Sequence, residues 1–502
     1  MPAALPHPAR WLARYRAAEV SSAPLATLRV VVGGLVALGA VRFVGEGWVE
    51  RLLGAAFRFD FYGFSWLPHV GVGGGYVLYA VIAASGLALA LGYRTRLSAP
   101  LCLAAFALAE LQDATHYLNH YYLVVLLLGL LCAVPAGARF SLDVAAKRMR
   151  ERARVPAWCV HVFVAQLAIV YLFAGLAKVN ADWLLRAMPL AVWLPERAWW
   201  PVLGGLFESP TAAYAFSWAG CVYDLTIVGW LLWRRSRPLA YAAVIVFHGL
   251  TWLLFNIGLF PLIMIGATLV FFDGAAHERA WARMRLLVER LRRHLRPSAS
   301  TTVAANLVSA DGTHRTVHVR VSATAEEASA KTEPTGHDAN TDGGGPRTRH
   351  TTSRRTSALV ALYLGVQLAL PLRALAYPGP VAWGEEGYRF GWRVMLVEKV
   401  GRAEFTVVDA ATGRRALVDN RAFLTAYQEK QMAIQPDFIL QFGHYLAEVY
   451  ADRYGFTRPA VYADVRVALN GRRSRPLIDP AVDLAAERDG LAAKSWIQPF
   501  AQ

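Results

Sequence analysis

The sequence contains long apolar runs, and their length constrains the fold more than any other feature. Runs of about 17–21 residues match the length that an α-helix needs to cross a hydrocarbon core roughly 30 Å thick. Only 18% of the residues are charged, against roughly 25% in soluble domains. We predict about nine crossing helices, at residues 25–41, 75–91, 97–111, 120–136, 159–177, 213–233, 239–255, 258–272 and 357–370. The ninth run is short, so it also fits a re-entrant or interfacial segment.

The distribution of basic residues predicts which side of the membrane each loop occupies. The net charge is +16, and arginines collect before the first run and in alternate loops after it. Cytoplasmic loops carry such an excess of positive charge. We therefore predict a cytoplasmic N-terminus and a C-terminal domain on the outer face of the plasma membrane. Charge placed beside membrane spans also favours a lipid bilayer over nucleic acid as a partner.

The predicted fold class is an α-helical integral membrane bundle with a C-terminal extramembrane α+β domain. Residues 1–273 hold eight spans, and residues 357–376 hold the ninth membrane segment. Between them, residues 274–356 comprise a basic amphipathic helix (about 276–296) on the inner surface and a Ser-, Thr- and Gly-rich, disordered cytoplasmic linker with a weak strand from Thr316.

Residues 377–502 read as a compact outer-face domain because strand and helix patterns replace the apolar runs. We expect strands at 387–398 and 403–410, joined by a short connection at 400–402. Helices are expected from Asp419 and from Pro436. A hairpin is expected where Asn470 and Gly471 follow an alternating segment, since this dipeptide favours tight primed turns.

Lysine usage gives the sharpest chemical signal. Only six of the 52 basic residues are lysines, and Lys178 stands at the outer end of the fifth run. Arginine cannot give up its proton in a protein, whereas a desolvated lysine can. Lys178 is therefore a candidate general base. The alternative is a lysine that extends along the bilayer edge with its ammonium group in water.

A second polar segment, QDATHYLNHYY at 112–122, precedes the fourth run and contains Asp113, His116, Asn119 and His120. The two histidines have the i, i+4 spacing of metal ligands, but no third ligand is evident, and the four cysteines form no C-x-x-C pair. We predict hydrogen-bonding groups at the membrane edge and no metal. The alternative is that these residues only begin a helix, with Asn119 as its N-cap.

A third segment, FHGLTWLLFNIGLF at 247–260, places His248 inside the seventh run and Asn256 near its outer end. A histidine at membrane depth is a functional hypothesis by default. Asp224, within the sixth run, needs a partner, for which we suggest His248; Asp182 could cap a helix. Lys178, His120 and Asn256 all lie toward the predicted outer face, so the three segments converge on one region.

These segments resemble those of the vitamin K-dependent gamma-glutamyl carboxylase family. YLFAGLAKVNADW, from Tyr171, resembles the sequence around the family's active-site lysine, and DATHYLNHYYL resembles its histidine segment, with Tyr117 in place of a tryptophan. FHGLTWLLFNIGLF, WGEEGYRFGW, LIDPAVDL and SWIQPF also match, in order, over about 30–500.

The resemblance implies a role for each matching residue. Lys178 and His120 would be catalytic. The remaining implied residues are Asn119, Asp113, His248 and Asn256 for cofactor binding, and Trp383, Tyr388 and Trp392 for binding the glutamate substrate.

The reaction implied is carboxylation of the γ-carbon of a peptide glutamate, coupled to epoxidation of reduced vitamin K (phylloquinol or menaquinol), with O2 and CO2 as co-substrates. The γ C–H is too weak an acid for any side-chain base, so the cofactor must do the hard chemistry. Lys178 would only deprotonate the hydroquinone. The partners implied are a glutamate-containing peptide or protein and a quinone reductase.

Two other functions remain open at this point. Animal members of the family carry a long C-terminal extension that does not appear in this sequence, which motivates a quinol-oxygenating enzyme (an epoxidase) with a different carboxylation substrate, or none. A transporter or membrane scaffold is the other alternative, although the sequence shows neither internal repeats nor broken helices at the midplane.

Overall fold

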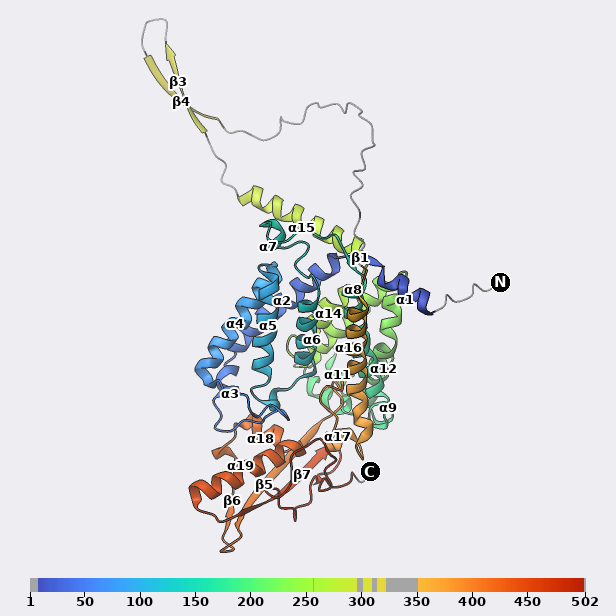
Figure 1. Ribbon diagram of the computed structural model, residues 1–502, viewed down its shortest axis with the longest axis vertical. Helices are drawn as coiled ribbons and strands as arrows, with labels where there is room; N and C mark the ends of the chain where they lie inside the picture. Colours follow the sequence, from blue (N-terminus) through green and yellow to red (C-terminus); the bar gives the residue numbers. More distant parts are fainter. Residues whose placement is uncertain (1–7, 256, 296–300, 309–313, 322–350, 501–502) are drawn as a thin grey trace, which may run out of the picture. The chain divides into compact units, whose positions relative to one another are not determined.

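The computed structural model describes residues 8–255, 257–295, 301–308, 314–321 and 351–500. These form two compact units. One comprises Met1–Gly274 and His350–Gln502, and the other is Ala275–Arg349. The first unit contains the helical bundle and the C-terminal domain, and the whole candidate site belongs to it (Figure 1).

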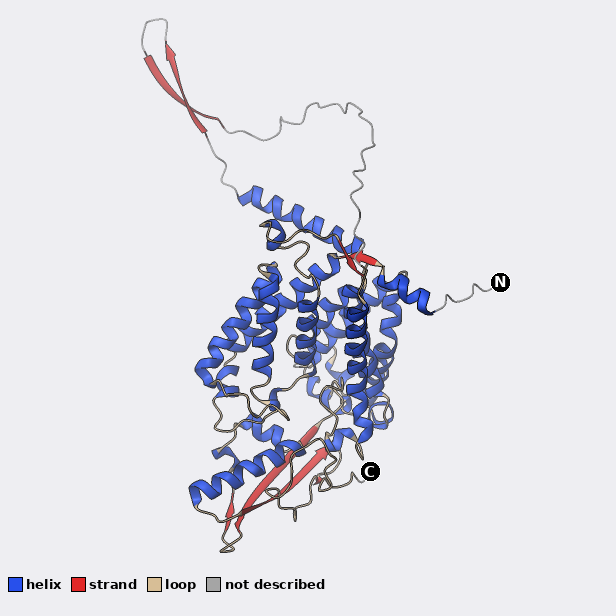
Figure 2. Ribbon diagram, viewed as in Figure 1, coloured by secondary structure: helices blue, strands red, loops and turns tan. Residues whose placement is uncertain are grey.

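The bundle of the first unit is built from nine main helices, which coincide with the nine predicted runs (Figure 2). Their bounds are α2 (Ala23–Gly45), α4 (Gly71–Leu91), α5 (Thr95–Glu110), α6 (Asn119–Ala133), α8 (Trp158–Lys178), α12 (Pro210–Leu232), α13 (Arg237–Leu254), α14 (Phe260–Thr268) and α16 (Arg354–Leu372). Within the described residues, six helices are long and apolar enough to span a membrane, or seven if one bent pair counts as a span. The chain is thus a multi-pass membrane protein, while the count of nine crossings stays a prediction.

Close packing in the bundle depends on small residues where α2 crosses α4. A Cβ added to Gly33 would lie 2.6 Å from the carbonyl oxygen of Gly86, and one added to Gly86 would lie 2.9 Å from that of Gly33. Glycine pairs of this kind let two membrane helices approach until their backbones touch. Any larger residue at either position would push the two helices apart.

A buried arginine fixes one end of the bundle. Arg29 of α2 is fully buried, and its guanidinium donates to the carbonyl oxygens of Ala136 (3.0 Å), Arg139 (3.2 Å) and Phe140 (2.6 Å). Because a buried charge is tolerated only when hydrogen bonds replace its water, these carbonyls make the arginine possible. The loop that follows α6 is thereby tied to α2.

The C-terminal domain has an antiparallel sheet in the order β6-β5-β7-β8, covered by helices. Its elements are β5 (Lys399–Asp409), β6 (Arg415–Leu417), β7 (Pro459–Leu469), β8 (Arg475–Pro476), α18 (Ala426–Met432) and α19 (Pro436–Tyr454). The core is formed by inward-facing residues of β5 and β7, such as Phe405 and Val465, and by Phe438 and Phe442 of α19. This confirms the predicted hairpin strand and the helix from Pro436.

The predicted strand at 387–398 is wrong. The segment forms successive turns, and the first strand of the domain begins only at Lys399, so that the predicted connection at 400–402 lies inside β5. Phe390, Trp392 and Met395 have φ values of 61°, 55° and 57°. Residues in the left-handed region interrupt extended pairing. The aromatic pattern that suggested a strand instead packs these turns against the bundle.

Two further details of the domain differ from expectation or refine it. The helix predicted from Asp419 is broken into a 3-10 turn (Asn420–Ala422) and α18, because Thr425 starts a new helix through a capping box with Gln428. At the hairpin turn, Asn470 and Gly471 both have positive φ, as the primed-turn prediction requires.

The second unit contains α15 (Gly274–Leu295), which confirms a helix at the predicted amphipathic segment. Strands β3 (Thr301–Val308) and β4 (His314–Val321) pair in antiparallel fashion, so the single weak strand predicted from Thr316 is one half of a hairpin. Of the rest of the predicted disordered linker, residues 296–300, 309–313 and 322–350 lie outside the described residues. At 351–356 the prediction is wrong, because Thr352 is buried and its N–H donates to the carbonyl oxygen of Arg16, and α16 begins at Arg354.

In the first unit, the C-terminal domain and the strand pair β1 (Glu19–Ser21) with β2 (Arg154–Pro156) lie at opposite ends of the bundle (Figure 1). Ala177 near the end of α8 and Leu254 at the end of α13 pack in one cluster with Leu396 of the C-terminal domain, and Asn119 at the start of α6 donates to the carbonyl oxygen of Arg393 of that domain. The three polar segments singled out in the sequence therefore meet at the boundary between bundle and domain.

Candidate functional site

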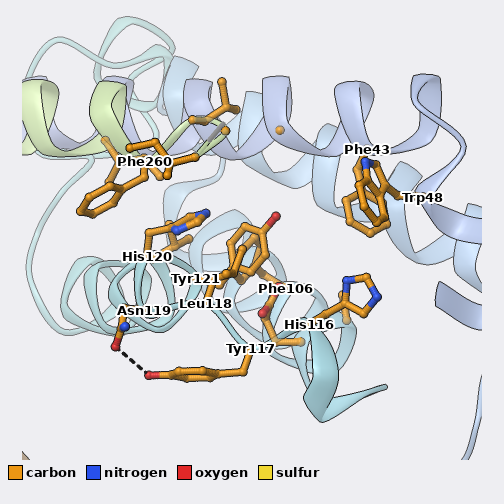
Figure 3. Close-up of a pocket in the computed structure, with 18 of the residues that line it drawn as sticks. Phe43, Trp48, Phe106, His116, Tyr117, Leu118, Asn119, His120, Tyr121 and Phe260 are labelled. Carbon is orange, nitrogen blue, oxygen red and sulfur yellow. Dashed lines mark hydrogen bonds between the residues drawn. The ribbon is translucent and has the colours of Figure 1, made fainter. Parts of the chain in front are cut away.

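A cavity of about 850 Å³ lies at the boundary between the bundle and the C-terminal domain. Aromatic side chains form part of its wall: Phe43, Trp48, Phe106, Tyr121 and Phe260 come from the bundle side (Figure 3), and Tyr388 and Tyr427 come from the domain. The volume falls within the range of small-molecule pockets, which are mostly apolar with a few placed polar groups. The cavity is therefore suited to a ligand with a planar, apolar body.

His120 is the central polar group on this wall. Its ring lies 4.5 Å from that of Tyr121 and 5.5 Å from that of Phe260, between centroids (Figure 3). No described residue forms a hydrogen bond or ion pair with its ring nitrogens. The two aromatic neighbours hold the imidazole in place and leave its nitrogens available to a molecule in the cavity.

Asn119 also lines the cavity, and it connects the bundle to the domain. Its Nδ2 donates to the carbonyl oxygen of Arg393 (3.1 Å), and its Oδ1 accepts from the hydroxyl of Tyr117 (3.1 Å). The N-cap position of α6 belongs to Leu118, so the alternative role of Asn119 as an N-cap is wrong. Because Tyr117 also accepts from the backbone N–H of Phe390 (2.7 Å), its hydroxyl joins both segments.

Asp113 lies beneath this loop and does not line the cavity. Its carboxylate accepts from the backbone N–H and hydroxyl of Thr115 (2.8 and 2.6 Å) and from Nε2 of Gln428 in α18 (2.7 Å). Burial raises the pKa of Asp113 to about 6 even though these hydrogen bonds oppose the rise. Asp113 thus shapes the loop that carries the histidines.

His116 lines the cavity beside Trp48 and Tyr427. Burial lowers the pKa of His116 to about 4, so the side chain is neutral at physiological pH. Among the residues that the structure describes, no group of three or more His, Cys, Asp or Glu is placed to hold a metal ion.

Lys178 lies in a separate buried cluster next to the cavity. Its ammonium group is 2.7 Å from Oδ2 of Asp224, and both side chains are only 7% exposed. The predicted partner of Asp224, His248, is wrong: His248 instead pairs through Nε2 with the hydroxyl of Tyr171 (3.2 Å), which also lies 3.4 Å from Oγ1 of Thr268. Four helices (α8, α12, α13 and α14) contribute to this cluster.

Phe260 belongs to both sites. It lines the cavity, and its ring centroid lies 5.9 Å from that of His248 and 5.5 Å from that of His120. A single aromatic side chain therefore contacts the two functional histidine candidates. His120 and Asn119 line the cavity together with Phe260, whereas Lys178 and His248 do not line it.

The other predicted residues lie in different parts of the structure, and most of them do not line the cavity. Of the three predicted substrate residues, only Tyr388 lines the cavity; Trp383 is buried in the core of the domain, and Trp392 stacks on Tyr122 of the bundle at 5.0 Å. Asn256 lies outside the described residues. Asp182 does not cap a helix, since Asn180 does so, and it pairs with Arg472 instead.

One residue of the cavity and one buried lysine of the C-terminal domain were not identified from the sequence. Glu110, the last residue of α5, lines the cavity. Lys399 is buried in the C-terminal domain, where Nζ donates to Glu385 (3.0 Å) and to the carbonyl oxygens of Trp383 (2.8 Å) and Ile434 (2.9 Å). The scarcity of lysine, which pointed to Lys178, was equally a signal for Lys399.

The fold and the site define a class of protein: a multi-pass helical membrane protein whose C-terminal, sheet-containing domain contributes to a cavity at one end of the helical bundle. Residues 15–275 match the family model of the HTTM domain, and residues 352–502 match that of the vitamin K-dependent gamma-carboxylase lumenal domain. The chain belongs to the vitamin K-dependent gamma-glutamyl carboxylase family. No solved structure matches it.

Proposed function

We propose that this protein carboxylates the γ-carbon of glutamate in a peptide or protein, using reduced vitamin K, O2 and CO2, and converts the cofactor to its epoxide. Family membership supports carboxylase function in general. The specific proposal rests on His120, which lines the cavity and has no hydrogen-bond partner for its ring nitrogens among the described residues. Its neighbour Phe260 also lies next to His248, one of the residues of the buried cluster that contains Lys178.

The cavity fits a hydroquinone (phylloquinol or menaquinol). Its aromatic wall suits a planar naphthalene ring, and His120 and Asn119 offer nitrogen atoms to the hydroxyl groups of such a ring. The cavity also adjoins the apolar bundle, where an isoprenoid side chain is soluble. When bound, the hydroquinone supplies, with O2, a base much stronger than any side chain. A quinone reductase would regenerate it.

In this proposal Lys178 removes a proton from a cofactor hydroxyl, and His120 orients the ring through a hydrogen bond. Phe260, which contacts both histidines, would separate the two sites at rest. The aromatic wall excludes water, which would otherwise quench a strong base. Tyr388, Arg393 and Tyr427 are among the residues that the C-terminal domain contributes to the wall, and the peptide glutamate would enter from that side.

We also propose that the N-terminus is cytoplasmic and that the C-terminal domain lies on the outer face of the plasma membrane. The basic loop at 146–154 and the C-terminal domain belong to opposite ends of the bundle (Figure 1). Cysteine substitutions test this in cells: an impermeant maleimide should label Ser474→Cys and leave Ala146→Cys unlabelled. The opposite labelling pattern would reverse the orientation.

A second candidate is a quinol-oxygenating enzyme of the same fold that carboxylates a different substrate, or none. The placement of Trp383 and Trp392 in packed cores favours it, because only Tyr388 of the predicted peptide-binding residues faces the cavity. Both candidates share the cofactor site and differ only in the acceptor of CO2.

Purified protein in lipid nanodiscs, given reduced vitamin K, O2, labelled bicarbonate and a glutamate-containing peptide, distinguishes them. We expect epoxide and labelled peptide from the wild type and from Lys430→Ala, an exposed control lysine, and neither from Lys178→Ala. Epoxide without labelled peptide would favour the second candidate. Neither product from folded wild-type protein offered several quinones would refute both.

A further inference from the structure

The ion pair between Lys178 and Asp224 restricts what the lysine can do as a base. Nζ lies 2.7 Å from Oδ2 of Asp224 and 3.3 Å from the carbonyl oxygen of Ala174, and the indole of Trp183 lies 5.3 Å away. Both partners are deeply buried, on helices α8 and α12. The lysine is thus surrounded by hydrogen-bond acceptors and an aromatic face, all of which favour its protonated form.

A protonated amine has no lone pair with which to remove another proton. Isolated charges in an apolar interior are very costly, whereas a hydrogen-bonded pair of opposite charges is tolerated. The resting cluster therefore holds Lys178 as ammonium and Asp224 as carboxylate. For Lys178 to act as a base, its own proton must first move elsewhere.

We propose that Asp224 is the group that finally holds the proton that Lys178 removes. The inference rests on the proposed function and adds a residue to it. An N–H bond of Nζ breaks as an O–H bond forms on Oδ2 of Asp224, and the freed lone pair of Nζ takes the proton of the bound hydroxyl. The pair changes from net charge 0 to +1, which balances the negative charge left on the cofactor oxygen.

No other group facing the pair can replace Asp224 as the counter-charge. The titratable residues that face Lys178 and Asp224 from their own and the adjoining helices are Tyr171, Cys221, Tyr223 and His248. None of them is a second carboxylate, and His248 is already hydrogen-bonded to Tyr171 through Nε2. Asp224 is therefore the single anion that faces Lys178 in the described part of the chain.

The first test measures the protonation of Lys178 without any quinone. A membrane-permeant acylating reagent reacts only with neutral amines, and mass spectrometry compares the acylation rate of Lys178 with that of exposed Lys430 in the same molecules. Removing the counter-charge in Asp224→Asn should raise the Lys178 rate at least ten-fold. An unchanged ratio would show that Asp224 does not control the proton and would overturn the inference.

The second test measures epoxide formation across a range of pH. In Asp224→Asn, a protonated Lys178 has no acceptor for its own proton, so the rate should be at least ten-fold below that of the wild type at acid pH and should rise with pH as the amine becomes neutral. Asp224→Glu, which keeps the carboxylate, should retain at least a tenth of the wild-type rate and the pH profile of the wild type. A folded Asp224→Asn protein with the same pH profile as the wild type would show that Lys178 acts without Asp224 and would overturn the inference. If Asp224→Asn does not fold, a folded Asp224→Glu protein that forms no epoxide would overturn the inference.

The two proposals fail in different ways. A wild-type protein that forms no epoxide removes the proposed function and this inference with it. An active wild type whose pH profile and Lys178 acylation ratio are both unchanged in Asp224→Asn removes only the inference.

Discussion

Asp182 and Arg472 join the membrane bundle to the C-terminal domain. Asp182 follows the end of α8, and both terminal nitrogens of Arg472, which lies just beyond β7, donate to its carboxylate, one of them at 2.8 Å. Asn470 of the same turn donates to the same carboxylate at 2.9 Å. Although burial opposes it, these donors hold the pKa of Asp182 below its usual range. The domain is thereby fastened next to the helix that carries Lys178.

We expect Arg472→Ala to loosen this attachment. Truncating one partner of a largely buried charged pair costs about 2 kcal/mol. The domain should then be cleaved faster by protease, and the KM for peptide should rise several-fold with little change in the KM for hydroquinone. The neighbouring Arg473, which is exposed, provides the control variant Arg473→Ala. Equal protease sensitivity of the two variants would contradict the prediction.

Replacing both members of the Lys178–Asp224 pair with apolar residues should restore most of the stability of the protein without restoring its activity. Lys178→Ala alone leaves a buried carboxylate without a partner, which costs about 3–5 kcal/mol. Adding Asp224→Leu to Lys178→Met should recover most of this loss, because apolar residues of similar size replace buried ion pairs well. Apparent Tm in nanodiscs measures the recovery, and epoxide formation should stay absent. A single variant as stable as the wild type would show that the pair is not buried in the membrane.

Lys399 is expected to hold the loop that presents Tyr388. It bonds Glu385 and the carbonyl oxygen of Trp383, and its side chain is only 1% exposed. Lys399→Met should therefore destabilise the domain by about 3 kcal/mol and raise the KM for peptide, while Lys430→Met should do neither. Thermal unfolding and peptide kinetics check the two effects. If the Lys399→Met variant were destabilised but had unchanged peptide kinetics, Lys399 would contribute to the stability of the domain and not to peptide binding.

The raised pKa of Asp113 leads us to expect a specific pH dependence of the free energy of unfolding. Since burial raises its pKa to about 6, the folded state binds the proton more tightly than the unfolded state does. Stability from this group is therefore greatest below pH 4 and falls as the pH rises through about 6. Relative to Asp113→Asn, which does not titrate there, the wild type should lose roughly 2–3 kcal/mol between pH 4 and pH 7.

Apparent Tm of the two proteins, measured at intervals from pH 4 to pH 7, tests this directly. The difference in Tm between wild type and Asp113→Asn should shrink as the pH rises. A constant difference would mean that the Asp113 carboxyl does not titrate in this range, and hence that it is less buried than the structure shows.

The sequence was a good guide to the elements of the bundle. All nine predicted apolar runs coincide with helices, because the length and hydrophobicity of a run are local properties of the chain. The same holds for α19 and for the turn at Asn470, where the pattern of a few neighbouring residues suffices. Prediction failed at 387–398, where contacts with the bundle override the strand propensity and the backbone enters the left-handed region.

The sequence predicted which residues belong to the candidate site better than it predicted which of them are in contact. Lys178 and His120 stood out because of the chemistry of a lone lysine and of histidine at a membrane edge. The partner of Asp224 was wrongly assigned to His248, and Asp182 was taken for a cap, because pairings between spans far apart in sequence leave no local pattern. Lys399 was overlooked although the same lysine count singled it out.

The sequence by itself determined that this chain is a multi-pass membrane protein with a separate C-terminal domain, since the hydrophobic effect acts on each run independently. Only the tertiary structure decided that His120 lines a cavity beside Phe260 while Lys178 lies outside that cavity in a buried ion pair with Asp224. Helix rotation and depth within a bundle depend on packing against all neighbours at once. Which side chains meet is therefore a property of the assembled helices and domain.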